Sequence, residues 1–274
     1  MNWLASLSGN SIVLNNLEMM SSSHFVVFDD SDDHESENYF VRSNHFVGID
    51  DSEQIYSAMS GLIQLINGAS AINLGFDNYI CRGNIKLDRL YYSKFPSISD
   101  SDSDSDWTNV KLPEDISPSN PFIGVGGSSC LSNPFNSPTT GYIELCLEHE
   151  DIFNILRQIS FGFDWRNLYC IWDTVCYYSG GQKKIIKDLG LNQSRIKAFT
   201  GTANNFGVLG LEARHGVMGW QIPKNIVSHE EAVNIVNEVV AKYLKNKICF
   251  GCEFKKWDSQ FRKSIQLTAN TSTD

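Results

Sequence analysis

The residues best suited to chemistry lie in one short stretch near the C-terminal end, Gly210-Leu-Glu-Ala-Arg-His-Gly216. Arginine is a permanent cation whose planar group suits phosphate, and histidine changes its charge near neutral pH. Arg214 and His215 are adjacent, and a glycine follows at the predicted end of a helix. We predict that Arg214 holds a phosphate and that His215 acts as a general acid or base.

Four polar residues beside this pair are the candidate substrate contacts. Thr202, Asn204 and Asn205 lie just upstream, and Glu212, three residues before His215, is placed to orient its ring. The alternative is that these residues are only caps and turns, since basic side chains also favour the carbonyls at a helix C-terminus. The sequence leaves both interpretations open.

Two patterns that resemble metal sites are predicted to bind no metal. Cys249-Phe-Gly-Cys252 supplies two ligands where zinc needs four, and no second pair follows. Residues 99–106 alternate Ser and Asp, so they could surround calcium, but they lack the turn glycine and bidentate glutamate of an EF-hand loop. A mobile acidic loop over residues 97–106 is the favoured interpretation. We therefore expect no metal and no other cofactor.

Charge is divided unevenly along the 274 residues, whose net charge is −10. Residues 1–150 carry 21 Asp and Glu against 6 Lys and Arg, whereas residues 151–274 carry 11 against 16. The overall balance excludes a general DNA-coating protein. An acidic half joined to a basic half indicates two domains with different partners, or two halves that attract each other.

The seven cysteines are scattered and odd in number, which favours a reducing cytoplasm over a disulfide framework. The N-terminal residues lack the basic and apolar regions of a signal peptide. No run of 18 apolar residues occurs, so no membrane span is expected. The sequence thus predicts a cytoplasmic protein without a membrane partner.

The first predicted domain, residues 1–149, is β-rich. Short segments at 25–28, 39–42, 46–49 and 85–92 are rich in β-branched and aromatic residues. One helix interrupts them: it starts at Ser52, carries an apolar face and ends at Asn67-Gly68, because glycine commonly follows the last helical residue. Residues 113–140 are predicted to be an irregular connection.

The second predicted domain, residues 150–248, is a basic helical bundle followed by a tail at 249–274. Apolar residues recur at helical spacing, and Asp164 and Asn192 are predicted helix caps. Ser228-His-Glu-Glu231 is a capping box before a long apolar stripe. The predicted fold class is therefore α+β, with a β-rich N-terminal domain followed by an α-helical bundle.

The second half also carries a longer pattern: a Trp165-x-x-Leu-Tyr helix, a Gly180-Gly181 break, Phe199-x-x-x-Ala203-Asn204, and Ala213-Arg-His-Gly216 before the last helix. It resembles a bacterial protein group for which no activity is implied. More loosely, residues 150–246 are similar to HEPN-like helical domains. That resemblance implies a metal-independent ribonuclease whose Arg and His share a site at a homodimer interface, commonly in phage defence. In that family several residues separate the pair, whereas here the two are adjacent, so binding and cleavage of RNA both stay open.

Two functions follow as expectations. The first is a protein that binds or cleaves RNA, with RNA and a second copy of the chain as partners. The second is a non-catalytic interaction module whose acidic N-terminal domain binds a basic protein partner. The surroundings of His215 distinguish them: a cleft shared with Arg214 favours the first, and burial of His215 within one subunit favours the second.

Overall fold

The computed structural model describes residues 2–20, 22, 24–29, 38–74, 85–93, 107–111, 116–123 and 137–248. The predicted acidic loop at 97–106 and the tail at 249–274, with Cys249 and Cys252, lie outside the described residues. The chain divides into two compact units, Met1–Asn67 with Gly83–Leu147, and Gly68–Arg82 with Glu148–Asp274. The division after Leu147 stands two residues before the predicted one, and the second unit also takes the end of one helix.

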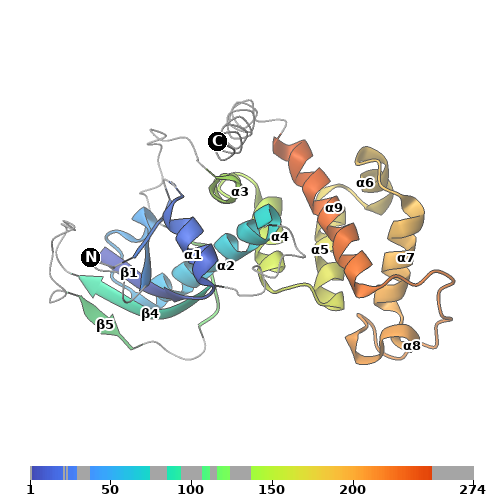
Figure 1. Cartoon of the computed structure of the whole chain (residues 1–274), viewed down its shortest axis with the longest axis horizontal. Coiled ribbons are helices and arrows are strands. Elements are labelled where there is room, and N and C mark those ends of the chain that lie inside the picture. Colours follow the sequence, from blue (N-terminus) through green and yellow to red (C-terminus); the bar gives the residue numbers. More distant parts are fainter. Residues whose placement is uncertain are drawn as a thin grey trace, which may run out of the picture. The chain divides into compact units, whose positions relative to one another are not determined.

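The first unit contains a five-stranded antiparallel sheet in the order β2-β3-β1-β4-β5. Its strands are β1 (Asn2–Ser8), β2 (Val26–Asp29), β3 (Tyr39–Arg42), β4 (Lys86–Ser93) and β5 (Thr108–Val110) (Figure 1). The central strand β1 pairs with both β3 and β4 and buries Trp3, Leu4, Ala5 and Leu7. This sheet, together with the helices of the second unit, confirms the predicted α+β class. The strands predicted at 25–28, 39–42 and 85–92 are confirmed to within a residue or two.

The strand predicted at 46–49 is wrong. A short 3-10 helix, η1 (Asn44–Phe46), occupies its start, and the Ser43 hydroxyl caps it by accepting from the backbone N–H of His45 at 3.2 Å. Gly48 follows with φ of +80°, which turns the chain away from an extended path. The buried Phe46 therefore marks a turn with an apolar anchor, and not a strand.

Three helices accompany the sheet: α1 (Ser11–Glu18), α2 (Ser52–Leu74) and α3 (Pro138–Leu145). The last of these begins inside the stretch that was predicted to be irregular. Ser137 caps it by accepting from the Thr139 N–H at 3.2 Å, and Pro138 suits the first helical turn because its missing N–H would have no helical partner there. The irregular prediction is therefore wrong for residues 138–140.

Helix α2 does not end at Asn67-Gly68, as the sequence predicts, but continues to Leu74. The Asn67 side chain pairs with both the N–H and the C=O of Ile85, at 2.9 Å each, and so does not end the helix. A Cβ placed on Gly68 would lie 2.1 Å from the carbonyl oxygen of Leu156. Gly68 is therefore needed for close backbone approach, which sequence alone does not separate from a C-cap glycine.

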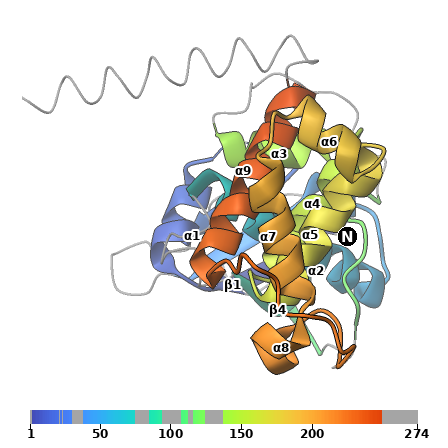
Figure 2. The same ribbon diagram turned by 90° about the vertical axis from the view of Figure 1, so that its right-hand side faces the viewer.

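The second unit contains the helices α4 (Glu150–Ser160), α5 (Trp165–Tyr178), α6 (Gln182–Asp188), α7 (Gln193–Asn204), α8 (Phe206–Leu209) and α9 (His229–Ile248), with a 3-10 turn η5 (Gly210–Glu212) after α8 (Figure 2). The predicted caps are confirmed. Asp164 and Asn192 each accept two backbone N–H groups, and the Ser228 hydroxyl accepts from Glu231 N–H at 3.1 Å.

The core of this unit forms where α5 contacts α4, α7 and α9. Trp172 and Phe199 are among its largest fully buried side chains. The apolar stripe of α9 is buried along its length, as predicted, and comprises Ala232, Ile235, Val236, Val239, Val240, Tyr243 and Leu244. Among the described residues, no helix has both the length and the apolar character that a membrane span requires.

Candidate functional site

Arg214 is held against helix α5. Its Nη2 lies 2.9 Å from the Asp173 carboxylate, and its guanidinium carbon lies 4.1 Å from the centre of the Tyr169 ring. Asp173 and Tyr169 stand four residues apart on α5, so both present to one side of the helix. The Arg214 N–H also donates to the carbonyl of Ala203 at 2.9 Å. The cation is thus sandwiched between an aromatic face and a carboxylate.

His215 contacts a different neighbour. Its ring packs edge-to-face on Trp220, with the ring centres 5.3 Å apart, and the residue is half-buried. Arg214 and His215 therefore point to separate groups, although the charge of each acts on Asp173. Burial raises the pKa of Asp173, and Arg214 and His215 only partly offset this rise. His215 is not fully buried, so the burial that would favour the interaction module is not observed, and neither His215 nor Arg214 lines the cleft described below.

Two of the four predicted substrate contacts, Thr202 and Asn205, are buried and anchor the backbone. Thr202 is fully buried; its hydroxyl donates to Ala198 O at 2.9 Å and accepts from Val227 N–H at 3.2 Å. Asn205 is buried too, and its amide donates to Gln221 O at 2.9 Å. These bonds hold the chain that follows α8. Asn204 has a buried Oδ1 without a hydrogen bond, and Glu212 is exposed.

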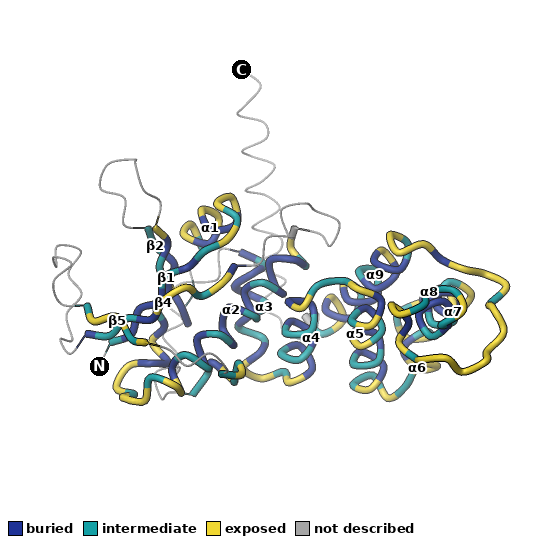
Figure 3. The backbone as a smooth tube through the Cα atoms, turned by 90° about the horizontal axis from the view of Figure 1, so that it is seen from below, coloured by how far each residue is buried: buried dark blue, intermediate teal, exposed yellow. Residues whose placement is uncertain are grey.

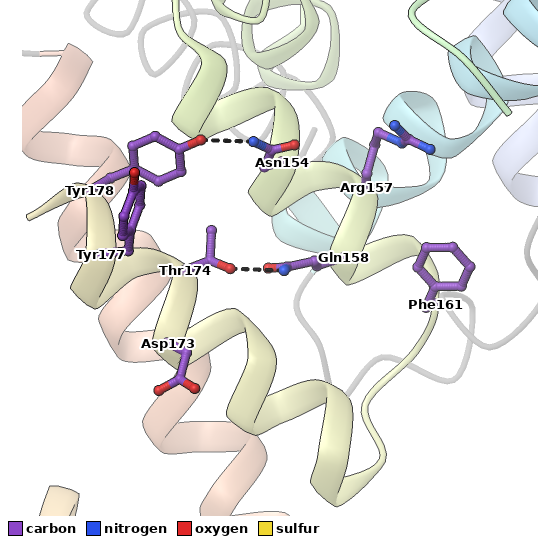
Figure 4. Close-up of a pocket in the computed structure, with 8 residues that line it drawn as sticks. All are labelled: Asn154, Arg157, Gln158, Phe161, Asp173, Thr174, Tyr177 and Tyr178. Carbon is purple, nitrogen blue, oxygen red and sulfur yellow. Dashed lines mark hydrogen bonds between the residues drawn. The ribbon is translucent and has the colours of Figure 1, made fainter.

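A cleft between α4 and α5, absent from the sequence-based predictions, has a volume of about 500 Å³. Figure 4 shows its two walls, each made by residues one helical turn apart. Helix α4 contributes Asn154, Arg157, Gln158 and Phe161, the last just beyond its end, and α5 contributes Asp173, Thr174, Tyr177 and Tyr178. The opposite face of α4 is apolar and buried, so packing of that face directs these polar and aromatic side chains outward.

Two hydrogen bonds cross the cleft and fix the spacing of its walls. Asn154 Nδ2 donates to the Tyr178 hydroxyl at 2.8 Å, and Gln158 Nε2 donates to the Thr174 hydroxyl at 2.8 Å (Figure 4). The rings at its edges are open to solvent: Phe161 is 65% exposed and Tyr177 is 78% exposed. The cleft thus combines hydrogen-bonded polar side chains between its walls with exposed aromatic rings at its edges.

The cleft also contains one cation and one anion. Arg157 lies over the Phe153 ring, with its guanidinium carbon 5.4 Å from the ring centre. Asp173 is the carboxylate that pairs with Arg214, so the predicted arginine lies directly beside the cleft without lining it. Arg214 stands out in the sequence because it adjoins a histidine, but the cleft residues carry no such local signal.

A second polar cluster is buried in the first unit. His24 Nε2 is hydrogen-bonded to the Glu144 carboxylate, and His24 Nδ1 lies 2.9 Å from His45 Nε2. Each histidine is 3% exposed, and the Phe122 ring packs edge-on against both. His45 lies 21 positions after His24 and Glu144 lies 120 positions after it. Because the three residues are this far apart in the chain, no local sequence pattern reveals the cluster.

The described residues contain no group of three or more His, Cys, Asp or Glu side chains that could hold a metal ion. The pKa of the Cys176 thiol is raised to about 12 by burial and by the charge of Asp173. That thiol is therefore protonated, and a poor nucleophile, at neutral pH.

Comparison with known proteins identifies no relative: no family model, no curated protein and no solved structure matches this chain.

Proposed function

We propose that the second unit binds single-stranded RNA in the cleft between α4 and α5. The observation that carries the proposal is the placing of two exposed rings, Phe161 and Tyr177, around Arg157 and the amides of Asn154 and Gln158. The basic balance of residues 151–274 supports the same ligand class, since RNA is a polyanion. We propose a cytoplasmic location with it, on the scattered, odd-numbered cysteines.

The aromatic, cationic and amide groups of the cleft match the base faces, the phosphate and the base edges of single-stranded RNA. Unstacked bases pack on aromatic rings, and such stacking contributes about 1–3 kcal/mol per base. A guanidinium binds phosphate through two parallel hydrogen bonds. Side-chain amides both donate and accept, so they pair with the polar edges of bases. In a duplex the base faces are stacked on one another inside the helix, so Phe161 and Tyr177 would have no base to stack on.

Binding is proposed in preference to cleavage because of the geometry of the predicted pair. A general acid or base must reach the reacting atom at hydrogen-bond distance. The His215 ring packs on Trp220, and the Arg214 guanidinium is engaged by Asp173 and Tyr169. One phosphate would have to displace Asp173 before both groups could act on it.

The test is fluorescence anisotropy of the full chain with a short labelled oligoadenylate, at several salt concentrations. Tyr177→Ala should weaken binding by an amount that corresponds to about 1–3 kcal/mol. Arg157→Gln should reduce the slope of log affinity against log salt by about one phosphate contact. Lys183→Gln, an exposed charge on α6 away from the cleft lining, is the matched control and should change neither.

Two results would contradict this proposal. One is the absence of salt-sensitive affinity for the single strand in the wild-type chain. The other is the release of RNA fragments by wild type, in the presence of a chelator, that His215→Ala abolishes. That second result would restore the ribonuclease prediction.

A further inference from the structure

The chain between α8 and α9 displays an unusual number of apolar side chains. Residues 211–226, called here the apolar segment, contain six of the thirteen large hydrophobic residues that are exposed in the described part of the chain. Figure 3 shows this stretch as mostly exposed. The six are Leu211 (83% exposed), Val217 (77%), Met218 (58%), Trp220 (49%), Ile222 (61%) and Ile226 (54%). Single exposed hydrophobic residues are normal, but a cluster marks an interaction surface.

The apolar segment is attached to the helices of the second unit by hydrogen bonds. Five such bonds join the helices to the backbone of the segment or of Val227, the residue that follows it. Arg166 donates to Leu211 O at 2.6 Å and to Ala213 O at 3.2 Å. The other three bonds are Arg214 N–H to Ala203 O, Asn205 Nδ2 to Gln221 O, and Val227 N–H to the Thr202 hydroxyl. The fold therefore holds the backbone at Leu211–Arg214, at Gln221 and at Val227, and the apolar side chains between these points face solvent.

The charge of this region differs from that of the chain as a whole. No carboxylate occurs between Glu212 and Glu230, although the chain has a net charge of −10. The same interval contains Arg214 and Lys224, together with two histidines. Glu212 lies at the start of the segment and Arg214 pairs with Asp173, so Lys224 is the cation that stands beside the exposed apolar side chains within the carboxylate-free stretch 213–229. An apolar surface that carries such a cation is complementary to an apolar phase with an anionic boundary.

We propose that the apolar segment docks on the surface of an anionic lipid bilayer. Val217, Met218 and Ile222 enter the region between headgroups and acyl chains, and Trp220 lies at headgroup depth, where indole rings are favoured. Lys224 lies beside lipid phosphate. Because an apolar phase offers no hydrogen bonds, the bonds made by the backbone of Leu211, Ala213, Arg214 and Gln221 reduce the cost of bringing those peptide groups close to it.

Two other partners, a second copy of this chain and RNA, fit the apolar segment less well than a lipid surface does. In a two-fold contact each copy offers the same surface, and Glu212 is the one carboxylate of the segment, so most of the surface opposite Lys224 would lack an anion. RNA would supply the anionic charge, but it favours aromatic rings for base stacking, and five of the six exposed side chains are not aromatic. The lipid surface alone uses both the apolar and the cationic character.

The proposal is tested by sedimenting the full chain with vesicles of two parts phosphatidylcholine to one part phosphatidylglycerol, and with phosphatidylcholine vesicles alone. We expect binding to the anionic vesicles and at least about tenfold weaker binding to the neutral ones. Met218→Asp should reduce binding to the anionic vesicles by at least about tenfold, and Lys224→Glu should reduce it as well.

Ile12→Asp is the matched control, because Ile12 is an exposed apolar residue of α1, 53% exposed, and the change adds the same charge. It should bind as wild type does. No binding to anionic vesicles, or equal binding by Met218→Asp, would overturn the proposal. Concentration-dependent dimers in sedimentation velocity that Met218→Asp dissociates would overturn it in favour of a second copy. Circular dichroism identical to wild type shows that Met218→Asp is folded.

Discussion

At the scale of single residues, Arg214 acts through its neighbours. Its partner Asp173 lines the cleft, so Arg214 neutralises a carboxylate that would otherwise repel phosphate. We expect Arg214→Ala to weaken RNA binding, and we expect Asp173→Asn in the same chain to restore it. The double variant separates this role from direct phosphate contact, since a lost phosphate ligand would not be recovered.

The same substitution should have a small effect on folding. Both side chains of the Arg214–Asp173 pair are partly exposed, at 35% and 45%, and exposed pairs contribute about 0.2–1 kcal/mol. Urea unfolding of Arg214→Ala should therefore show a slight loss of stability. A loss of several kcal/mol would show that Arg214 is chiefly structural.

Asp151 gives a prediction on pH dependence. Its carboxylate accepts hydrogen bonds from Tyr243 and Lys247, with Lys247 Nζ at 2.8 Å. Burial raises the pKa of Asp151, but the bonds from Lys247 and Tyr243 more than reverse this, so the pKa lies below its usual value of 3.8. A lowered carboxyl pKa stabilises the fold above the unfolded-state pKa, and this stability is lost as pH falls through the folded-state pKa.

Asp151→Asn should therefore be less stable than wild type at neutral pH, by about 1–3 kcal/mol, because it leaves two buried or half-buried donors poorly matched. This difference in unfolding free energy should shrink when urea unfolding is measured at a pH below 3.8, because Asp151 loses its negative charge there in the unfolded chain. Urea titrations at the two pH values provide the measurement. A difference that does not change with pH would contradict the assigned role of the carboxylate.

At the scale of elements, helix caps could be predicted and tertiary approach could not. The starts at Asp164, Asn192 and Ser228 were predictable because a capping side chain binds N–H groups two or three residues ahead. The role of Gly68 could not be predicted, because it depends on the backbone of Leu156, which is distant in sequence. The cleft was missed for the same reason: its walls meet only when α4 packs on α5.

Gly68 supplies the prediction at this scale. Alanine is a better helix former than glycine by about 1 kcal/mol, so propensity alone favours Gly68→Ala. The added Cβ, however, would meet the backbone of Leu156 at 2.1 Å, and backbone cannot yield as a side chain does. We expect a net loss of about 1–3 kcal/mol in thermal or urea unfolding.

Gly216→Ala is the control, since a Cβ there meets nothing within 4 Å and Gly216 does not have a positive φ. It should unfold close to wild type. A Gly68→Ala protein that is more stable than wild type would mean that α2 ends before Gly68, as the sequence alone predicts.

At the scale of the whole molecule, each unit has its own buried core, a sheet core in the first and a helical core in the second. The buried cluster of His24, His45 and Glu144 lies in the first unit, and Val236, 1% exposed, lies in the second. Chains with separate cores commonly unfold in separate steps. We expect calorimetry of the full chain to show two transitions.

One substitution in each core assigns these transitions. Glu144→Gln weakens the bond to a buried histidine and should lower one of them by the equivalent of about 1–3 kcal/mol. Val236→Asp buries an unpaired carboxylate on α9 and should lower the other by several kcal/mol, whereas Asn234→Asp, exposed on the same helix, should leave it in place. Each core then behaves as an independent unit of stability. If both substitutions shift one shared transition, the two units unfold as a single cooperative body, and the assignment of a separate stability to each core is wrong.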